Sequence, residues 1–190
     1  MPKSIQDIIV IGGSAGSLPA ILNIVDKLPD NFVTPVVIVL HRLRNVVSDM
    51  SRILSASQPN FKIHEPEDKE RIKQKHIYIA PQNYHLLIED DKTISLDYSE
   101  AVNYSRPSID VTFESVAHVF ADKTTAILLS GANADGAEGA AVIAKAGGTV
   151  IIQDPETSDY PAMPMAALEM VRGALVKTPD EIVDFIRQKC

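Results

Sequence analysis

Short apolar runs recur along the chain and alternate with longer segments of helical spacing. The runs IIVI (8–11) and PVVIVLH (35–41) are rich in β-branched residues and are apolar throughout, which is typical of strands buried on both faces of a sheet. TTAILLS (124–130) and GTVIIQ (148–153) repeat this pattern later in the chain. These runs predict a parallel sheet that is covered by helices on both faces.

The segments between these runs predict the covering helices. In SLPAILNIVDKL, the apolar residues Leu18, Ile21, Leu22 and Val25 share one helical face, and a proline lies near the start. In the last segment, Thr178 and Glu181 have the spacing of a capping box. Similar helical patterns occupy residues 47–57, 108–120, 135–147, 164–173 and 178–189.

Residues 58–107 depart from this alternation. Residues 61–81 contain two short strand candidates around a strongly charged segment, which is interpreted as a solvated turn. NYHLLIEDDKTISLDYS (83–99) predicts a hairpin whose turn contains Glu89 to Lys92. The predicted fold is therefore one α/β domain over residues 1–190, with a doubly wound, mostly parallel sheet, helices on both faces and an antiparallel β-hairpin near residues 84–97.

Composition narrows the possible partners and the compartment. The chain has 190 residues, 45% of them hydrophobic, and a net charge of −7, which argues against a nucleic-acid partner. The single cysteine, Cys190, forms no intramolecular disulfide, and this favours a reducing compartment. The N-terminus does not resemble a signal peptide, and the longest apolar run (33–40) is too short to span a bilayer. We therefore expect a cytoplasmic protein that does not insert into membranes.

The glycine-rich turn after the first strand is the most specific local motif. A dinucleotide-binding fingerprint would need glycine at Ser14 and Ser17, and the phosphate-loop pattern is also absent. The turn does fit G-x-S-x-G, in which small neighbours let a serine hydroxyl project outward from a sharp strand-to-helix turn. Ser14 is thus a candidate nucleophile, and the alternative is a serine that only caps the helix in a tight turn.

A serine nucleophile needs a base and an acid that orients the base. His41 ends the second buried strand, which is predicted to lie beside the first, and His85 is a lesser candidate. Asp135 follows a later buried strand. It is either an N-terminal helix residue that the helix dipole favours or the acid that orients the histidine. Parallel strands bring these ends into one crevice. The order Ser14, His41, Asp135 differs from that of an α/β-hydrolase.

The chain resembles the catalytic domain of the protein-glutamate methylesterases of bacterial chemotaxis over roughly residues 7–188. The resemblance lies in several motifs in order: IVIGGSAGS, VVIVLH, HIYIAPQNYHLLIE, SRPSIDVTFESVA, ILLSGANADGAEGA and GGTVIIQDPETSDYPAMPMAAL. It implies hydrolysis of γ-glutamyl methyl esters on the cytoplasmic domains of chemoreceptors, with release of methanol. Related enzymes also deamidate receptor glutamines. No metal or organic cofactor is expected.

The resemblance also implies roles for individual residues. Ser14 matches the nucleophile, His41 the general base and acid, and Asp135 the orienting carboxylate. The backbone amides of Ala132 and Ala15 match oxyanion donors. Met163, with Pro164, and Arg106 are candidates for the substrate cleft, although Arg106 equally fits a surface arginine at a helix entry.

Several features depart from the family pattern. Methionine is common in the family at the position of Ala132, threonine at Ala15 and glycine at Ser17, and the residues at Pro161 and Ala162 also differ. Family members commonly carry an N-terminal receiver domain, whereas the given sequence starts almost at the first predicted strand. Either a receiver domain lies outside the given sequence or the protein works without one of its own. A standalone domain is the hypothesis, with a separate receiver domain as a second candidate partner. The alternatives are a non-catalytic signalling module, a hydrolase of other small esters and, most weakly supported, a nucleotide-binding domain.

Overall fold

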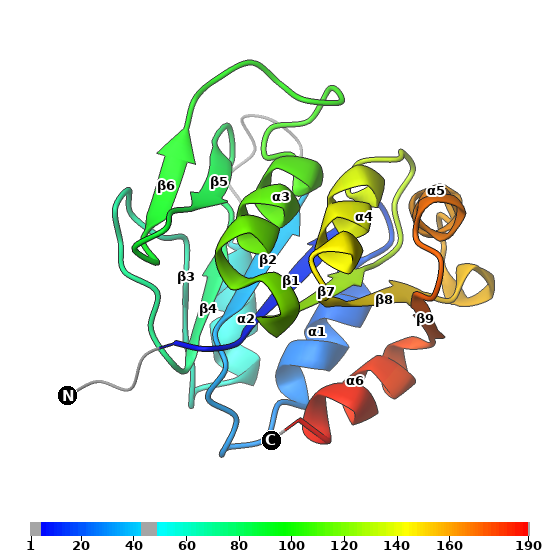
Figure 1. Cartoon of the computed structure of the whole chain (residues 1–190). Coiled ribbons are helices and arrows are strands. Elements are labelled where there is room, and N and C mark those ends of the chain that lie inside the picture. Colours follow the sequence, from blue (N-terminus) through cyan, green and yellow to red (C-terminus); the bar gives the residue numbers. More distant parts are fainter. Residues whose placement is uncertain (1–4, 43–48, 190) are drawn as a thin grey trace.

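The computed structural model describes residues 5–42 and 49–189, and its centre is a seven-stranded sheet (Figure 1). The strand order is β3-β4-β2-β1-β7-β8-β9, and every pairing is parallel. The strands are β1 (Ile8–Gly13), β2 (Val36–Leu40), β3 (Lys62–His64), β4 (His76–Ile79), β7 (Thr124–Leu128), β8 (Thr149–Gln153) and β9 (Leu175–Lys177). The strands predicted from the apolar runs are all present.

Helices cover both faces of this sheet (Figure 1). One face packs against α1 (Leu18–Asp26), α2 (Met50–Ser57) and α6 (Pro179–Arg187). The other face packs against α3 (Ile109–Phe120), α4 (Ala137–Lys145) and α5 (Ala162–Met170). The β-branched side chains of each strand alternate between these two cores, as expected for strands buried on both faces. The doubly wound α/β prediction is confirmed.

A separate antiparallel hairpin, β5 (His85–Ile88) and β6 (Ile94–Asp97), lies against α3. Its buried residues Leu86 and Ile94 extend the core on the α3 side of the sheet. The Thr112 hydroxyl on α3 donates to the Leu86 carbonyl at 2.7 Å, which fixes the hairpin to the helix. The predicted hairpin is confirmed, and it brings the chain back toward the start of α3.

Two parts of the sequence prediction need comment. The short strand β9 was not predicted, because it has three residues, lies at the sheet edge and leaves Leu175 and Val176 exposed. The helix predicted for residues 47–57 begins at Met50 in the structure. Residues 47 and 48 of the predicted range lie outside the described ranges, as does Cys190. No helix in the described ranges is long and apolar enough to cross a membrane.

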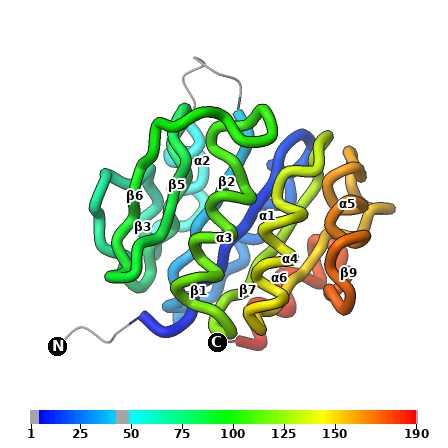
Figure 2. Tube along the Cα trace, turned by 45° about the horizontal axis from the view of Figure 1, so that its top comes forward, coloured from blue at the N-terminus to red at the C-terminus, as the bar shows by residue number. Residues whose placement is uncertain are grey.

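Strand order determines where a site can form. β1 lies between β2, which follows it in the chain, and β7, to which the chain returns after β4 and the hairpin. Such a reversal opens a crevice beyond the carboxyl ends of the strands. In Figure 2 the turn after β1 and the loop before α4 lie together at one end of the sheet.

The C-terminal helix α6 offers a test of the predicted capping box. Glu181 N–H donates to Thr178 Oγ1 at 3.4 Å, and the Glu181 carboxylate accepts from Thr178 N–H at 2.8 Å. We expect Thr178→Ala to lower the free energy of unfolding by about 1 kcal/mol, measured by urea denaturation, because an amide at the helix start loses its acceptor. Thr178→Ser retains the hydroxyl and is the control. An equal loss in both variants would assign the effect to the threonine methyl group.

Candidate active site

Backbone hydrogen bonds between neighbouring strand ends place Ser14, His41 and Asp135 around one crevice. Ser14 follows β1, His41 follows β2, and Asp135 lies in the loop between β7 and α4. The His41 amide donates to the Gly13 carbonyl at 3.1 Å, and the Ser14 amide donates to the Ser130 carbonyl at 2.9 Å. The three predicted positions thus meet at the carboxyl ends of three adjacent strands. In the described part of the chain the Ser14 hydroxyl itself makes no hydrogen bond to the His41 ring.

The turn that carries Ser14 requires its small residues. A Cβ on Gly12 would lie 2.5 Å from Ile109 Cγ2, so only glycine lets β1 approach α3 this closely. Gly16 has φ of +76°, a conformation that side chains rarely adopt. The buried Ser17 hydroxyl donates to the Ser14 carbonyl at 2.7 Å and fixes the turn from inside. The turn therefore presents residue 14 at its outer edge.

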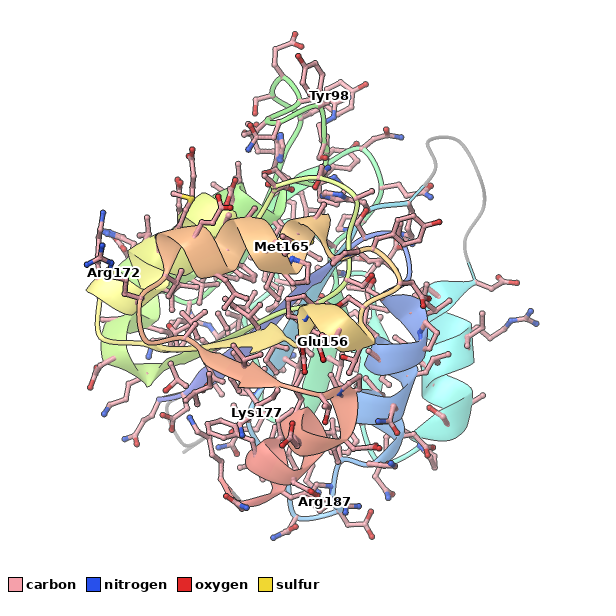
Figure 3. All side chains as sticks on the ribbon, turned by 90° about the vertical axis from the view of Figure 1, so that its right-hand side faces the viewer. Tyr98, Glu156, Met165, Arg172, Lys177 and Arg187 are labelled. Carbon is pink, nitrogen blue, oxygen red and sulfur yellow. The ribbon has the colours of Figure 1, made fainter. Side chains whose placement is uncertain are left out.

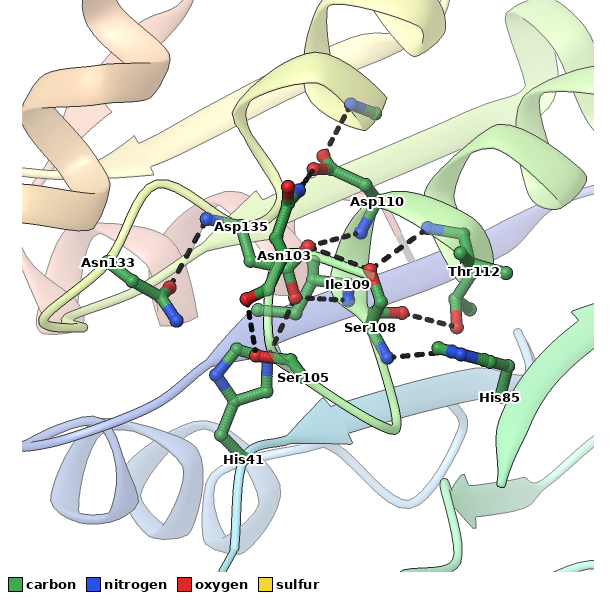
Figure 4. Close-up of polar contacts among 12 residues, drawn as sticks. His41, His85, Asn103, Ser105, Ser108, Ile109, Asp110, Thr112, Asn133 and Asp135 are labelled. Carbon is green, nitrogen blue, oxygen red and sulfur yellow. Dashed lines mark hydrogen bonds and ion pairs between the residues drawn. The ribbon is translucent and has the colours of Figure 1, made fainter. Parts of the chain in front are cut away.

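His41 and Asp135 form a short, largely buried hydrogen bond, at 2.8 Å between Nε2 and Oδ2 (Figure 4). Burial would raise the pKa of Asp135, but the hydrogen bonds from His41 and from the start of α3 lower it below its ordinary value. The carboxylate therefore stays ionised, and Nε2 of His41 carries the proton that it donates. In the neutral form of the ring this places the lone pair on Nδ1, the nitrogen that a general base needs.

The N-terminus of α3 holds the Asp135 carboxylate. Oδ1 accepts from the Ser108 hydroxyl at 2.8 Å and from the Asp110 amide at 3.1 Å, and Oδ2 accepts from the Ile109 amide at 2.7 Å. Free amides and the helix dipole make a helix N-terminus favourable for an anion. Ser108 and the α3 amides are functional neighbours that the sequence prediction missed.

His85 is a structural residue and does not face the crevice as a base. Its ring is buried, and Nδ1 accepts from the Ser108 amide at 3.1 Å (Figure 4). Nε2 donates to the Glu100 carbonyl at 3.0 Å. Both nitrogens are therefore occupied in holding the loop that precedes α3. The weaker prediction of His85 as the base was wrong, because sequence context alone did not show that its ring is enclosed.

The amides of Ala132 and Ala15 are available as donors. Ala132 is exposed, and neither amide donates a hydrogen bond within the described ranges. The two turns are joined by Ser130, whose hydroxyl donates to the Ala15 carbonyl at 2.8 Å. Two free N–H groups on linked turns beside Ser14 are suited to stabilising an oxyanion.

The two residues predicted for the cleft lie in different environments. Met163 is fully buried, and its Cε would lie 2.5 Å from a Cβ on Gly131. Its side chain therefore packs against the loop that carries Ala132. Arg106 lies in the loop before α3 and lines a cavity of about 120 Å³ together with His41 and Arg42. This position favours the substrate-side interpretation of Arg106 over that of an unrelated surface arginine.

Asp110 is a second buried carboxyl group beside Asp135. It accepts from the Gly139 amide at 2.7 Å and from Asn103 Nδ2 at 2.9 Å, so it joins α3, α4 and the loop at 101–105 (Figure 4). Burial, reinforced by the nearby charge of Asp135, raises the pKa of Asp110 to about 6. The surroundings therefore raise the pKa of Asp110 and lower the pKa of Asp135.

A hydrogen-bonded His–Asp pair next to a serine on a strand-to-helix turn is an arrangement of serine hydrolases. The model of the CheB methylesterase family matches residues 9–186, and the chain belongs to this family.

Relatives and a solved structure agree with this assignment. A Leptospira interrogans protein named putative protein-glutamate methylesterase/protein-glutamine glutaminase is 46% identical over 94% of this chain and 93% of its own length. A Thermotoga maritima protein-glutamate methylesterase/protein-glutamine glutaminase is 32% identical over 94% of this chain, which spans 54% of that relative. The crystal structure of the Thermotoga maritima CheB methylesterase catalytic domain superimposes with a TM-score of 0.91 at 31% identity, covering 97% of this chain and 99% of that chain.

The raised pKa of Asp110 predicts a specific pH dependence of stability. The folded protein binds this proton more tightly than the unfolded chain, whose value is about 3.9, so the stabilising contribution of the proton is full below that pH and is lost as the pH rises through about 6. Asp110→Asn cannot ionise. We expect its free energy of unfolding, relative to wild type, to increase by about 1–3 kcal/mol between pH 4 and pH 7.

Urea denaturation across this pH range measures the effect, with Asp184→Asn on the exposed face of α6 as the control. The control should follow the wild-type pH dependence. A difference between Asp110→Asn and wild type that stays constant with pH would contradict a raised pKa at Asp110.

Proposed function

We propose that this protein hydrolyses γ-glutamyl methyl esters on the cytoplasmic domains of chemoreceptor-type proteins, with release of methanol, and that it deamidates glutamine side chains at the same site. The His41–Asp135 hydrogen bond beside Ser14, within the CheB methylesterase fold, carries the proposal. The names of the Leptospira and Thermotoga relatives, which include both activities, support it.

Acylation begins at Ser14. The hydroxyl attacks the ester carbonyl as His41 Nδ1 takes its proton, and the ionised Asp135 stabilises the imidazolium that results. Asp135 can do so because its hydrogen bonds lower its pKa despite burial. The histidine is already oriented by the acid, because Nε2 is directed at the Asp135 carboxylate.

The amides of Ala132 and Ala15 stabilise the tetrahedral oxyanion. His41 then gives its proton to the departing methoxy group, and methanol leaves an acyl-enzyme on Ser14. Water, deprotonated by the same ring, attacks the acyl carbon. The bond to Ser14 Oγ breaks, His41 returns the proton to Oγ, and the product leaves as the glutamate carboxylate. A glutamine substrate follows the same route with ammonia as the leaving group.

The His–Asp pair is what argues against a purely non-catalytic signalling module, since a docking surface has no need of a buried and costly ionised carboxylate. A protein substrate of the chemoreceptor type is the proposed partner, and a separate receiver domain is the proposed regulator. The cytoplasm is the proposed compartment, because it holds the methylated part of such receptors.

Replacement of Ser14 tests the nucleophile. We expect Ser14→Ala to reduce methanol release by about 10⁴- to 10⁶-fold, because the acyl-enzyme cannot form. The assay uses receptor membranes premethylated with labelled methyl groups, and Ser51→Ala on α2 is the control for loss of a serine elsewhere.

The possible outcomes separate the parts of the proposal. A Ser14→Ala rate within tenfold of wild type would exclude Ser14 as the nucleophile. If wild type releases no methanol while a fluorophosphonate still labels Ser14, the protein is a serine hydrolase with another substrate.

A further inference from the structure

Two arginines line the small cavity beside His41. The cavity has a volume of about 120 Å³ and is lined by His41, Arg42, Tyr104, Ser105, Arg106 and Pro107. Arg42 follows the histidine directly in the sequence, whereas Arg106 reaches the cavity from the loop before α3. Two cations from distant parts of the chain therefore meet next to the candidate base.

Arg42 is almost fully enclosed, and two of its nitrogens, Nε and Nη1, make no hydrogen bond within the described ranges. Its side chain is 7% exposed, Nη2 donates to the Ala80 carbonyl at 2.7 Å, and Nη1 lies 2.9 Å from the Glu65 carboxylate. Nε is buried and has no hydrogen-bond partner within the described ranges. The buried Nε has almost no accessible surface, so Arg42 contributes positive charge to the wall of the cavity that it lines.

Arg106 has the same property. Nη1 donates to the carbonyls of Tyr98 at 3.3 Å and Ser99 at 2.7 Å, and the guanidinium lies over the Tyr98 ring at 4.0 Å. These contacts hold the guanidinium in place, while its buried Nε lacks a partner in the described part of the chain. Its orientation is thus fixed before any ligand binds.

Arg42 and Arg106 each have an acidic group nearby, but in the described part of the chain only Arg42 forms an ion pair, with Glu65. Glu65 pairs with Arg42, whereas Asp97 is exposed and is hydrogen-bonded to Ser99. A planar guanidinium with free N–H groups prefers carboxylate as its partner. The cavity volume of about 120 Å³ accommodates a carboxylate on a short stem.

The cavity is offset from the position of the reacting ester. Ser14 follows β1, and the amide of Ala132 lies beyond β7, whereas Arg42 contacts Ala80 beyond β4 on the opposite side of His41. Adjacent strands are about 4.8 Å apart, so this cavity lies to one side of the scissile bond. Tyr104, which is 99% exposed, lies at its rim, where a bound chain would contact it.

We propose that Arg42 and Arg106 form a carboxylate-binding subsite, which takes an acidic side chain of the protein substrate that neighbours the esterified glutamate. This inference rests on the proposed function and adds a rule of substrate choice to it. An acidic residue placed on the correct side of the ester increases kcat/KM, and the same residue elsewhere on the substrate does not.

Matched helical peptides test the subsite. Each contains one glutamate γ-methyl ester, with a single Glu or Gln placed one, three or four residues away on either side. We expect wild type to favour Glu over Gln by about 10- to 100-fold in kcat/KM at one of these positions. In Arg106→Gln and in Arg42→Gln the ratio should fall to within about twofold of one.

Arg172→Gln is the matched control, because it removes the same charge from an exposed arginine at the end of α5 that points away from the molecule (Figure 3). It should keep the wild-type ratio. Circular dichroism checks that each variant folds. If Arg106→Gln does not fold, Arg106→Lys replaces it, since lysine keeps the charge but has no Nε–H and should lose most of the preference.

The other outcomes overturn the proposal. Equal kcat/KM for the Glu and Gln peptides at every position excludes the subsite while leaving the esterase activity intact. Stronger inhibition of wild type than of the arginine variants by the de-esterified peptide, without a Glu preference, assigns the arginines to the product carboxylate instead. If folded wild type hydrolyses none of the peptides, the proposed function fails and the subsite fails with it.

Discussion

The buried carboxylate of Asp135 at the N-terminus of α3 is the interaction on which the geometry of the site depends. An ionised carboxylate at 1% exposure would be strongly destabilising without compensation. Two α3 amides, a serine hydroxyl and the His41 ring supply it with donors at 2.7 to 3.1 Å. Loss of any of these donors would affect both the charge and the ring that depends on it.

The packing of the surrounding elements follows from this constraint. For Asp135 to reach the α3 amides, the helix must approach β1 and the loop before α4 closely. A Cβ on Gly12 or Gly136 would lie 2.5 or 2.7 Å from the Ile109 side chain, so both positions require glycine. Gly12 and Gly136, on either side of the crevice, thus both allow close packing against Ile109. The turn that positions Ser14 therefore depends on the close packing of α3 against β1.

The sequence was sufficient to predict those features that depend on periodicity and on the topology of parallel strands. Apolar runs located the buried strands, and their alternation with helices implied that the residues after β1, β2 and β7 would meet, as the backbone contacts of Ser14 and His41 confirm. Ser108 was not found, because its contact with Asp135 arises from a loop that returns to the site after the hairpin. The catalytic roles of the predicted residues stay predictions, since their positions alone do not establish a reaction.

The departures from the family pattern at Ala15 and Ala132 change side chains and leave the backbone groups of the site in place. At Ala15 and Ala132 the donors proposed for the oxyanion are main-chain amides, which alanine leaves in place. Under the proposed function, discrimination among substrates would depend on side chains elsewhere along the crevice, and Arg106 and the fully exposed Tyr104 lie beside His41 on the side away from these alanines. A site of this kind can keep its chemistry constant while its substrate preference changes through a single loop.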